Sequence, residues 1–190
     1  MTEKLDGSII LREKFIHDAR KFQIFESHYR TVKGDERTHC FLRYPPSVRI
    51  VPITRDGHIV LIREFKFAAN EYVLCLPSGT VEQNETVLGA AKREMEEETA
   101  YTSDSLTDLG AYHLAPTLVE QEARVVLAAN VHRLQNLIES DEYERDRISV
   151  VQMRTEEILV AVRDSLIRDG QAMVAILKAF VHLGIGFTLP

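Results

Sequence analysis

The sequence predicts a mixed α/β fold in which helices pack on a β-sheet, preceded by an N-terminal antiparallel β segment. Short apolar and β-branched runs separated by turn signals dominate the first part of the chain. The pattern becomes helical over residues 85–99, and residues 155–184 contain two amphipathic helical stretches. Strand-like runs combined with such helices are typical of a sheet covered by helices.

The N-terminal β segment is expected to contain strands at residues 7–11, 22–30 and 38–43. Lys33-Gly34-Asp35 is a turn signal before the last of them. Pro45-Pro46 cannot continue a hydrogen-bonded ladder, so the segment should end near this pair. We therefore divide the chain into a β segment over residues 1–43 and a main domain over residues 44–190.

The main domain begins with apolar runs at residues 48–54 and 58–65, which are joined by the hairpin signal Arg55-Asp56-Gly57. A helix is expected over residues 85–99, and Asp169-Gly170 should divide the C-terminal pattern into two helices. Three more strands are expected, at residues 72–76, 106–114 and 123–131.

Composition limits the classes of function. The 190 residues fit one domain with at most a small appendage, and 45% are apolar, which is enough for a core. The formal net charge of −6 argues against a general binder of nucleic acid or of anionic membranes. A small phosphorylated substrate remains compatible with this charge, because a bound cation can reverse the local field.

Cysteine usage and apolar runs favour a cytoplasmic protein. Cys40 and Cys75 lie in strand-like runs without the spacing of a redox or zinc motif, so both are expected to be reduced structural thiols. The N-terminus has no apolar stretch of signal-peptide length, and no run approaches membrane-spanning length.

Three glutamates in the predicted helix point to a metal site. Glu94, Glu97 and Glu98 stand at i, i+3 and i+4, so they project from one side of a helix and repel one another. A hard divalent cation such as Mg²⁺ removes this repulsion and prefers oxygen ligands. The alternative is a solvated acidic face, which is the commoner explanation of an acidic run considered alone.

Neighbouring residues have supporting expectations. Arg93 precedes Glu97 by four residues and can orient its carboxylate through an ion pair. Glu96 falls on the opposite side of the helix and is expected to be solvated. Gly79 should let the backbone come close to the site.

The spacing around these residues resembles the signature of the Nudix hydrolases. Gly79 is followed after five residues by Glu85, and after seven more by Arg93-Glu94-Met95-x-Glu97-Glu98-x-Ala100-Tyr101. One departure is Ala100, since the family has a glycine in this slot at the helix end, where a left-handed conformation is favoured.

The resemblance implies a Nudix fold, with a mixed sheet sandwiched between helices, and a site for two or three Mg²⁺ or Mn²⁺ ions. Glu94 and Glu98 would be the principal ligands, with Glu97 beside them and the backbone carbonyl of Ser78 completing the set. Glu85 would hydrogen-bond within the motif. The implied reaction is attack of water on one phosphorus of a diphosphate, with Glu97 as one candidate for the catalytic base.

Further segments resemble the ADP-ribose pyrophosphatase branch of the family. These are residues 44–54 (YPPSVRIVPIT), residues 61–79 (LIREFKFAANEYVLCLPSG) and Pro116, which falls about fifteen residues after the signature. The branch implies hydrolysis of ADP-ribose or a related nucleoside diphosphate sugar. It also implies a homodimer with exchanged N-terminal strands that help to form the nucleoside pocket.

Side chains outside the signature complete the expected site. Glu120 and Glu122 follow Pro116, where the branch places a catalytic carboxylate, and the alignment of the next strand favours Glu122. Arg63 and Lys66 occupy the segment where the branch places substrate-binding cations. Solvated glutamates, and strand-end charges paired with Glu64, are the plain alternatives.

Two other functions remain open at this stage. One is another Nudix activity, on dinucleoside polyphosphates, nucleoside triphosphates or capped RNA. The other is a Nudix-fold module that binds a nucleotide without catalysis, although such modules usually lose signature glutamates that this chain retains. Base preference, sugar preference and the identity of the general base among Glu97, Glu120 and Glu122 stay undetermined.

Overall fold

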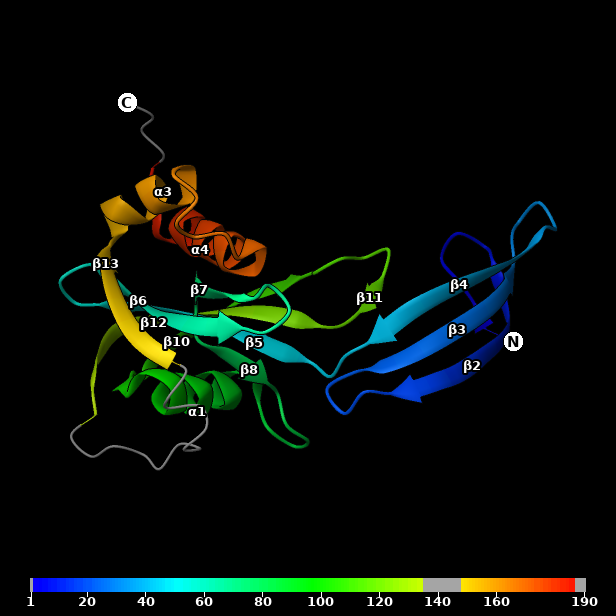
Figure 1. Ribbon diagram of the computed structural model, residues 1–190, viewed down its shortest axis with the longest axis horizontal. Coiled ribbons are helices and arrows are strands. Elements are labelled where there is room, and N and C mark those ends of the chain that lie inside the picture. The colour runs from blue at the N-terminus through cyan, green and yellow to red at the C-terminus, as the bar shows by residue number, and fades with distance from the viewer. Residues whose placement is uncertain (1, 135–147, 187–190) are drawn as a thin grey trace. The chain divides into compact units, whose positions relative to one another are not determined.

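The computed structural model describes residues 2–134 and 148–186, which form two compact units (Figure 1). Unit 1 contains the N-terminal strands up to Pro46 together with the loop His113–Glu122. Unit 2 contains Ser47–Tyr112 and the chain from Ala123 onward. A loop from the middle of the sequence therefore belongs with the N-terminal strands.

Unit 1 is a five-stranded sheet in the order β1-β2-β3-β4-β11. Its first four strands are antiparallel, and the short β11 runs parallel to β4. The register pairs Phe25 with Phe41, whose rings stack with centroids 5.7 Å apart. The bounds are β1 Thr2–Glu3, β2 Ile9–Asp18, β3 Gln23–Arg30, β4 Glu36–Arg43 and β11 Val119–Glu120.

Three features of unit 1 differ from the sequence prediction, and the first is the two-residue strand β1, which was not predicted. Strand β2 continues well beyond residue 11. Its second half is exposed, and it is in strand conformation because it pairs with β3, with two register shifts. Strand β11 was not predicted. It has two residues and exists only because Val119 and Glu120 pair with Leu42 and Arg43.

Unit 2 is built on a mixed sheet whose main path is β10-β12-β5-β6-β13. Strands β12 and β5 are parallel, and the other pairs are antiparallel. Strands β7, β8 and β9 pair with β6, β5 and β12 respectively. The bounds are β5 Ser47–Thr54, β6 His58–Lys66, β7 Glu71–Cys75, β8 Ser78–Thr80, β9 Tyr101–Thr102, β10 Ser105–Tyr112, β12 Ala123–Arg133 and β13 Ile148–Arg154.

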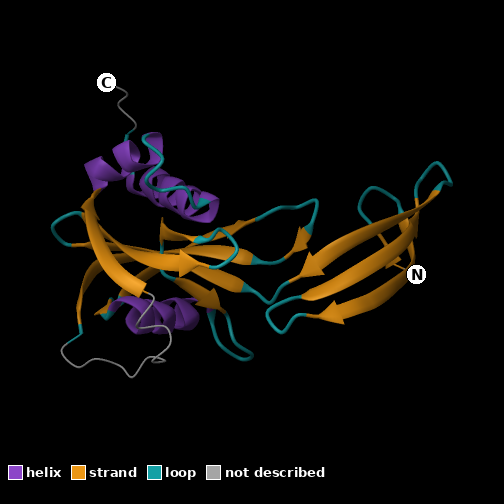
Figure 2. Ribbon diagram, in the orientation of Figure 1, coloured by secondary structure: helices purple, strands orange, loops and turns teal. Residues whose placement is uncertain are grey.

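Among the described residues, three helices cover this sheet: α1 (Val87–Thr99), α3 (Thr155–Arg163) and α4 (Gly170–Leu183). Figures 1 and 2 show α1 on one face of the sheet and α3 with α4 on the other. The predicted mixed sheet between helices is therefore confirmed. None of the helices in the described residues has the length and apolarity needed to cross a membrane.

The core follows from the alternation of side chains along the strands. In β5, Val48 and Ile50 pack in the cluster that includes Met95 of α1, whereas Val51 packs with Phe180 of α4. Neighbours two residues apart share a face, so one strand can supply both clusters. The sheet is thereby buried on both sides, which explains its nearly continuous apolar runs.

Helix α1 begins two residues later than expected and ends as the family signature implies. The Thr86 hydroxyl accepts a hydrogen bond from the backbone N–H of Gly89 at 3.0 Å, which caps the first turn. Ala100 closes the helix in the left-handed conformation, with φ 57° and ψ 28°, and its N–H donates to the carbonyl of Glu96. Alanine therefore adopts the conformation for which glycine is usually selected.

Strands β8, β9 and β13 were not predicted. Strands β8 and β9 have three and two residues, too few for an alternating pattern to be recognised. Strand β13 is long enough, but its residues are mostly part-buried or exposed, and it acquires strand conformation by pairing along β6. Such strands depend on partners far away in the sequence.

Candidate functional site

Glu98 of α1 is hydrogen-bonded to the backbone of β8. Its Oε2 accepts a hydrogen bond of 2.8 Å from the backbone N–H of Ser78, where strand β8 begins. Desolvation raises the pKa of Glu98 to about 8, the Ser78 hydrogen bond opposes the rise, and the negative charges of Glu94 and Glu64 add to it. A cation bound beside this carboxylate would stabilise its charged form and lower its pKa.

Glu94 lies directly against the backbone of β8. A Cβ built on Gly79 would lie 1.9 Å from Oε1 and 2.3 Å from Oε2 of Glu94. Only a residue without a side chain leaves this space to the carboxylate. The close approach expected at Gly79 is therefore present, and it brings Glu94 and Glu98 to the same short strand.

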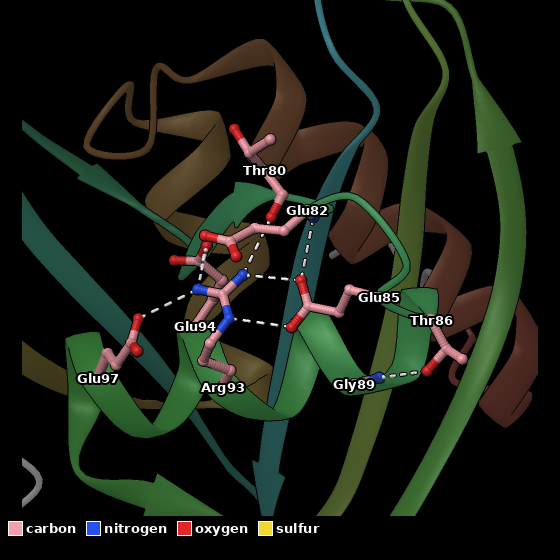
Figure 3. Close-up of polar contacts among 8 residues, drawn as sticks. All are labelled: Thr80, Glu82, Glu85, Thr86, Gly89, Arg93, Glu94 and Glu97. Atoms are coloured by element: carbon pink, nitrogen blue, oxygen red, sulfur yellow. Dashed lines mark hydrogen bonds and ion pairs between the residues drawn. The ribbon is translucent and has the colours of Figure 1, made fainter.

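Arg93 binds three acidic side chains of the motif (Figure 3). Its Nε and Nη2 donate to the carboxylate of Glu85 at 3.0 Å each. Its Nη1 donates to Glu94 at 2.8 Å and to Glu97 at 3.2 Å, and Nη2 also reaches the Thr80 carbonyl. The hydrogen bonds to Glu85 are the main cause that raises the pKa of Arg93.

Glu85 is hydrogen-bonded both to the loop before α1 and to Arg93 of the helix. Besides Arg93, it accepts a hydrogen bond of 3.1 Å from the backbone N–H of Glu82. The hydrogen bonds from Arg93 lower the pKa of Glu85 below its usual value, desolvation opposing this. Glu85 thus ties the loop before α1 to the middle of the helix.

Glu96 does not behave as expected. It was predicted to be solvated, but its Oε1 accepts a hydrogen bond from the hydroxyl of Thr102 at 2.5 Å. The contact closes only after the chain turns at Ala100, so helix periodicity alone did not show it.

The donor set at β8 and α1 fits a hard divalent cation. It consists of carboxylate oxygens and backbone carbonyls, which are the ligands of Mg²⁺ and Mn²⁺. As the side chains stand, no three carboxylate, imidazole or thiol groups among residues 2–134 and 148–186 converge on one point. Arg93 holds Glu94 and Glu97 in this arrangement, so metal binding would exchange contacts with Arg93 for contacts with the ion.

The two predicted substrate-binding cations lie differently. Lys66 pairs with Glu64, and the charges of both act on the pKa of Glu98. Arg63 stacks on the ring of Tyr72, with its Cζ 4.3 Å from the ring centroid. Side chains three residues apart on β6 point to opposite faces, so Arg63 and Lys66 are separated by the sheet.

The carboxylates of the loop after Pro116 belong to unit 1. Glu120 is bound by Arg43 through two hydrogen bonds of 3.0 Å, from Nε and Nη2. Arg43 also donates to Glu13 at 3.1 Å and covers the ring of Phe25 at 4.1 Å. Glu122 is exposed at the end of the same loop.

The same unit contains a pocket of about 960 Å³. Its lining includes aromatic side chains from β3 and β4, together with Pro116 and Leu118. Arg43 and Glu120 supply charge at its wall. Its volume lies within the range of small-molecule sites.

Three residues that the sequence did not single out form a polar cluster in unit 2. Arg49 donates to the Gln171 side chain, which also accepts from the hydroxyl of Tyr112. Arg49 and Gln171 are 122 positions apart, and no sequence pattern connects them.

Both cysteines are free thiols. Cys40 is exposed, and burial raises the pKa of Cys75 to about 12.

Comparison with known proteins finds relatives that are named as hydrolases of ADP-ribose or of ADP compounds. ADP-ribose pyrophosphatase of Bacillus subtilis (strain 168) is 25% identical over 174 residues, which cover 92% of this chain and 92% of that protein. ADP compounds hydrolase NudE of Escherichia coli (strain K12) is 29% identical over 134 residues, 70% of this chain and 72% of that protein.

The fold comparison and the family comparison agree with each other. A crystal structure of an ADP compounds hydrolase superimposes with a TM-score of 0.83 over 96% of this chain and 97% of that chain, at 24% identity. The NUDIX domain matches residues 43–170, a range that contains the whole carboxylate motif. The chain therefore belongs to the Nudix hydrolase family.

Proposed function

We propose that this Nudix hydrolase uses Mg²⁺ or Mn²⁺ to cut the diphosphate bond of ADP-ribose or a related nucleoside diphosphate sugar. The products would be a nucleoside monophosphate and a sugar phosphate. The observation that carries the proposal is the arrangement at β8, where Glu94 fills the space beside Gly79 and Glu98 accepts from the N–H of Ser78. Relatives that act on ADP-ribose and on ADP compounds support the substrate class.

We assign the metal ligands to Glu94, Glu97, Glu98 and the backbone carbonyl of Ser78. A bound divalent ion supplies electrostatic stabilisation of the phosphoryl oxygens and acidifies a bound water. Arg93 supports the set by holding Glu94 and Glu97 on the same side of α1 as Glu85. The N–H of Ser78 orients the carboxylate of Glu98.

The remaining roles belong to residues outside the metal set. Lys66, which pairs with Glu64 on β6, is assigned to the diphosphate, as the resemblance to the ADP-ribose pyrophosphatase branch implies. Arg63, stacked on Tyr72 at the other face, is assigned to a more distant part of the substrate. We propose Glu122 as the general base and prefer it to Glu120, because the alignment of the following strand with the ADP-ribose pyrophosphatase branch favours Glu122.

Unit 1 is proposed to take the nucleoside and to form the dimer. Its pocket has aromatic walls that suit a purine ring, including Tyr29 and Phe41. Its strands expose apolar side chains such as Phe15 and Ile16, which exchanged strands of a homodimer would cover. Light scattering coupled to size-exclusion chromatography tests the dimer.

A turnover screen tests the proposed reaction. The panel contains ADP-ribose, ADP-glucose, GDP-mannose and UDP-glucose, each with Mg²⁺ and with Mn²⁺, and the nucleoside monophosphate is measured by chromatography. We expect ADP-ribose or another nucleoside diphosphate sugar to have the highest kcat/KM. Carrying out the reaction in H₂¹⁸O shows which phosphorus receives the water oxygen.

Two outcomes of the screen would contradict the proposal. A dinucleoside polyphosphate, a nucleoside triphosphate and a capped RNA represent the other Nudix activities, and a preference for any of them would overturn the assigned substrate class. Absence of metal-dependent turnover on every nucleoside diphosphate derivative would favour a nucleotide-binding module instead.

A further inference from the structure

Arg49 connects helix α4 to strand β8, which is hydrogen-bonded to helix α1. It is a partly buried residue near the start of β5 and is paired in register with Ser78 of β8. Its Nη1 donates to the hydroxyl of Ser78 at 2.6 Å. Its Nε and Nη2 donate to Gln171 at 3.0 and 2.7 Å.

Gln171 is itself held in place from two sides. Its backbone N–H donates to the carboxylate of Asp169, the residue that caps the N-terminus of α4. Its side-chain oxygen accepts from the hydroxyl of Tyr112 at 3.0 Å, in addition to the two bonds from Arg49. The guanidinium has donors only, so the amide oxygen must face Arg49, and this fixes the orientation of Gln171.

Ser78 connects Arg49 to the carboxylate motif. Its hydroxyl accepts from Arg49, and its backbone N–H donates to Glu98 on α1. The next residue is Gly79, whose backbone touches the carboxylate of Glu94. A displacement of Ser78 therefore changes the positions of both acidic side chains and of the Ser78 carbonyl.

We infer that Arg49 is a positioning residue of the metal site, because it links Gln171 of α4 to Ser78 and thereby sets the place of the Ser78 carbonyl and of Glu98. This inference rests on the proposed function, which assigns those groups to the metal. Arg49 contacts neutral oxygens in all three bonds, so the two-pronged shape of the guanidinium, rather than charge pairing, makes the connection.

The alternative role for a partly buried arginine beside a diphosphate site is direct contact with substrate. The two roles predict different measurements. A positioning residue changes metal affinity in the absence of substrate, whereas a substrate ligand changes KM at saturating metal and leaves metal affinity intact. The test therefore measures binding of Mn²⁺ alone.

The experiment compares metal-free wild-type protein with Arg49→Met, Arg49→Lys and Ser78→Ala. Free Mn²⁺ is quantified by electron paramagnetic resonance during titration, and each variant is also followed by thermal unfolding. Arg124→Met is the matched control, because Arg124 is another partly buried arginine of the same sheet and is paired with Asp108. Loss of a supporting group typically weakens metal binding about 10- to 100-fold.

We expect Arg49→Met and Ser78→Ala each to weaken Mn²⁺ binding by about 10-fold or more. Arg124→Met should leave it unchanged. Lysine at position 49 should restore only part of the affinity, since one ammonium group cannot reach Ser78 and Gln171 with the geometry of the fork. The double variant Arg49→Met with Ser78→Ala should bind Mn²⁺ no more weakly than either single variant, because both remove one connection.

Unchanged Mn²⁺ affinity in folded Arg49→Met and Ser78→Ala would overturn the inference, as would a change confined to KM. Should Arg49→Met fail to fold, Ser78→Ala decides alone, since it removes one hydroxyl and keeps the backbone. Wild-type protein that binds no Mn²⁺ and hydrolyses nothing would instead refute the proposed function. Wild-type protein that binds and hydrolyses, beside unchanged variants, would refute the role of Arg49 only.

Discussion

The carboxylate of Glu94 occupies the space that a side chain at position 79 would need, since a Cβ on Gly79 would come within 1.9 Å of it. Strand β8 and the middle of α1 are therefore in close contact at this point. The glycine of the motif is required here by this contact and not by a turn, because its φ lies outside the left-handed region.

Gly79→Ala is therefore expected to displace Glu94 and to weaken metal binding. The added methyl group overlaps the carboxylate, so either Glu94 rotates away or β8 moves. We expect Mn²⁺ affinity to fall about 10- to 100-fold, measured by titration of the metal-free protein. Gly186→Ala serves as control, since nothing lies within 4 Å of a Cβ at that position. Normal Mn²⁺ affinity in Gly79→Ala would show that Glu94 is not a ligand.

Glu122→Gln tests the proposed general base. Loss of a general base typically costs about 10²- to 10⁴-fold in rate, so kcat should fall within that range while Mn²⁺ affinity is kept. Glu120→Gln is the comparison, because Arg43 binds that carboxylate and we expect a change of less than 10-fold in kcat. Steady-state kinetics at saturating metal measures both, and near-normal turnover by Glu122→Gln would exclude the assignment.

Ala100→Gly is expected to stabilise the protein. A left-handed backbone costs a residue with a side chain about 1–2 kcal/mol, and this strain exceeds the extra entropy that glycine loses on folding. The net gain should be about 1 kcal/mol, or an increase of about 2–4 °C in Tm for a chain of this size. Calorimetry measures it.

Replacing alanine by glycine inside a helix should have the opposite effect on stability. Ala172 is buried in α4, where the backbone is helical, so Ala172→Gly should lower the free energy of unfolding by about 1 kcal/mol. A destabilising effect at both positions would mean that Ala100 is not strained.

Glu85 should contribute stability that depends on pH. Its pKa is lowered from the usual 4.5 in the folded protein, mainly by Arg93. A lowered carboxyl pKa stabilises the fold above the unfolded pKa, and this contribution is lost as pH falls through the folded pKa. The free energy of unfolding of wild type should exceed that of Glu85→Gln by about 1–2 kcal/mol above about pH 5, and the difference should shrink below pH 4.5.

Urea unfolding of both proteins at several pH values between 7 and about 3.5 measures this difference. In the background Arg93→Lys the difference should be smaller, because lysine cannot reproduce the two bonds from Nε and Nη2. A difference that is independent of pH would show that the pair with Arg93 does not stabilise the charged form of Glu85.

Much of unit 2 was predictable because its signals are local. The helix with its glutamates, the hairpin around Asp56-Gly57 and the division at Asp169-Gly170 each follow from spacing within a few turns or strand residues. The pair of Arg93 with Glu97 is of the same kind, since it joins adjacent turns of one helix. The opposite faces of Arg63 and Lys66 also follow from strand alternation, once β6 is known to continue through both.

The sequence by itself determined the type of fold, the carboxylate helix and the family, because helix and strand periodicity and the spacing of the glutamates are properties of neighbouring residues. Only the tertiary structure decided which side chains meet across the chain, as Arg49 does with Gln171 and Arg43 with Glu120. It likewise decided that the loop carrying Glu122 folds with the N-terminal strands. These contacts join segments that are far apart in the sequence, where no periodic pattern indicates which residues meet. They depend on packing and hydrogen bonding in the folded protein rather than on local conformational preference.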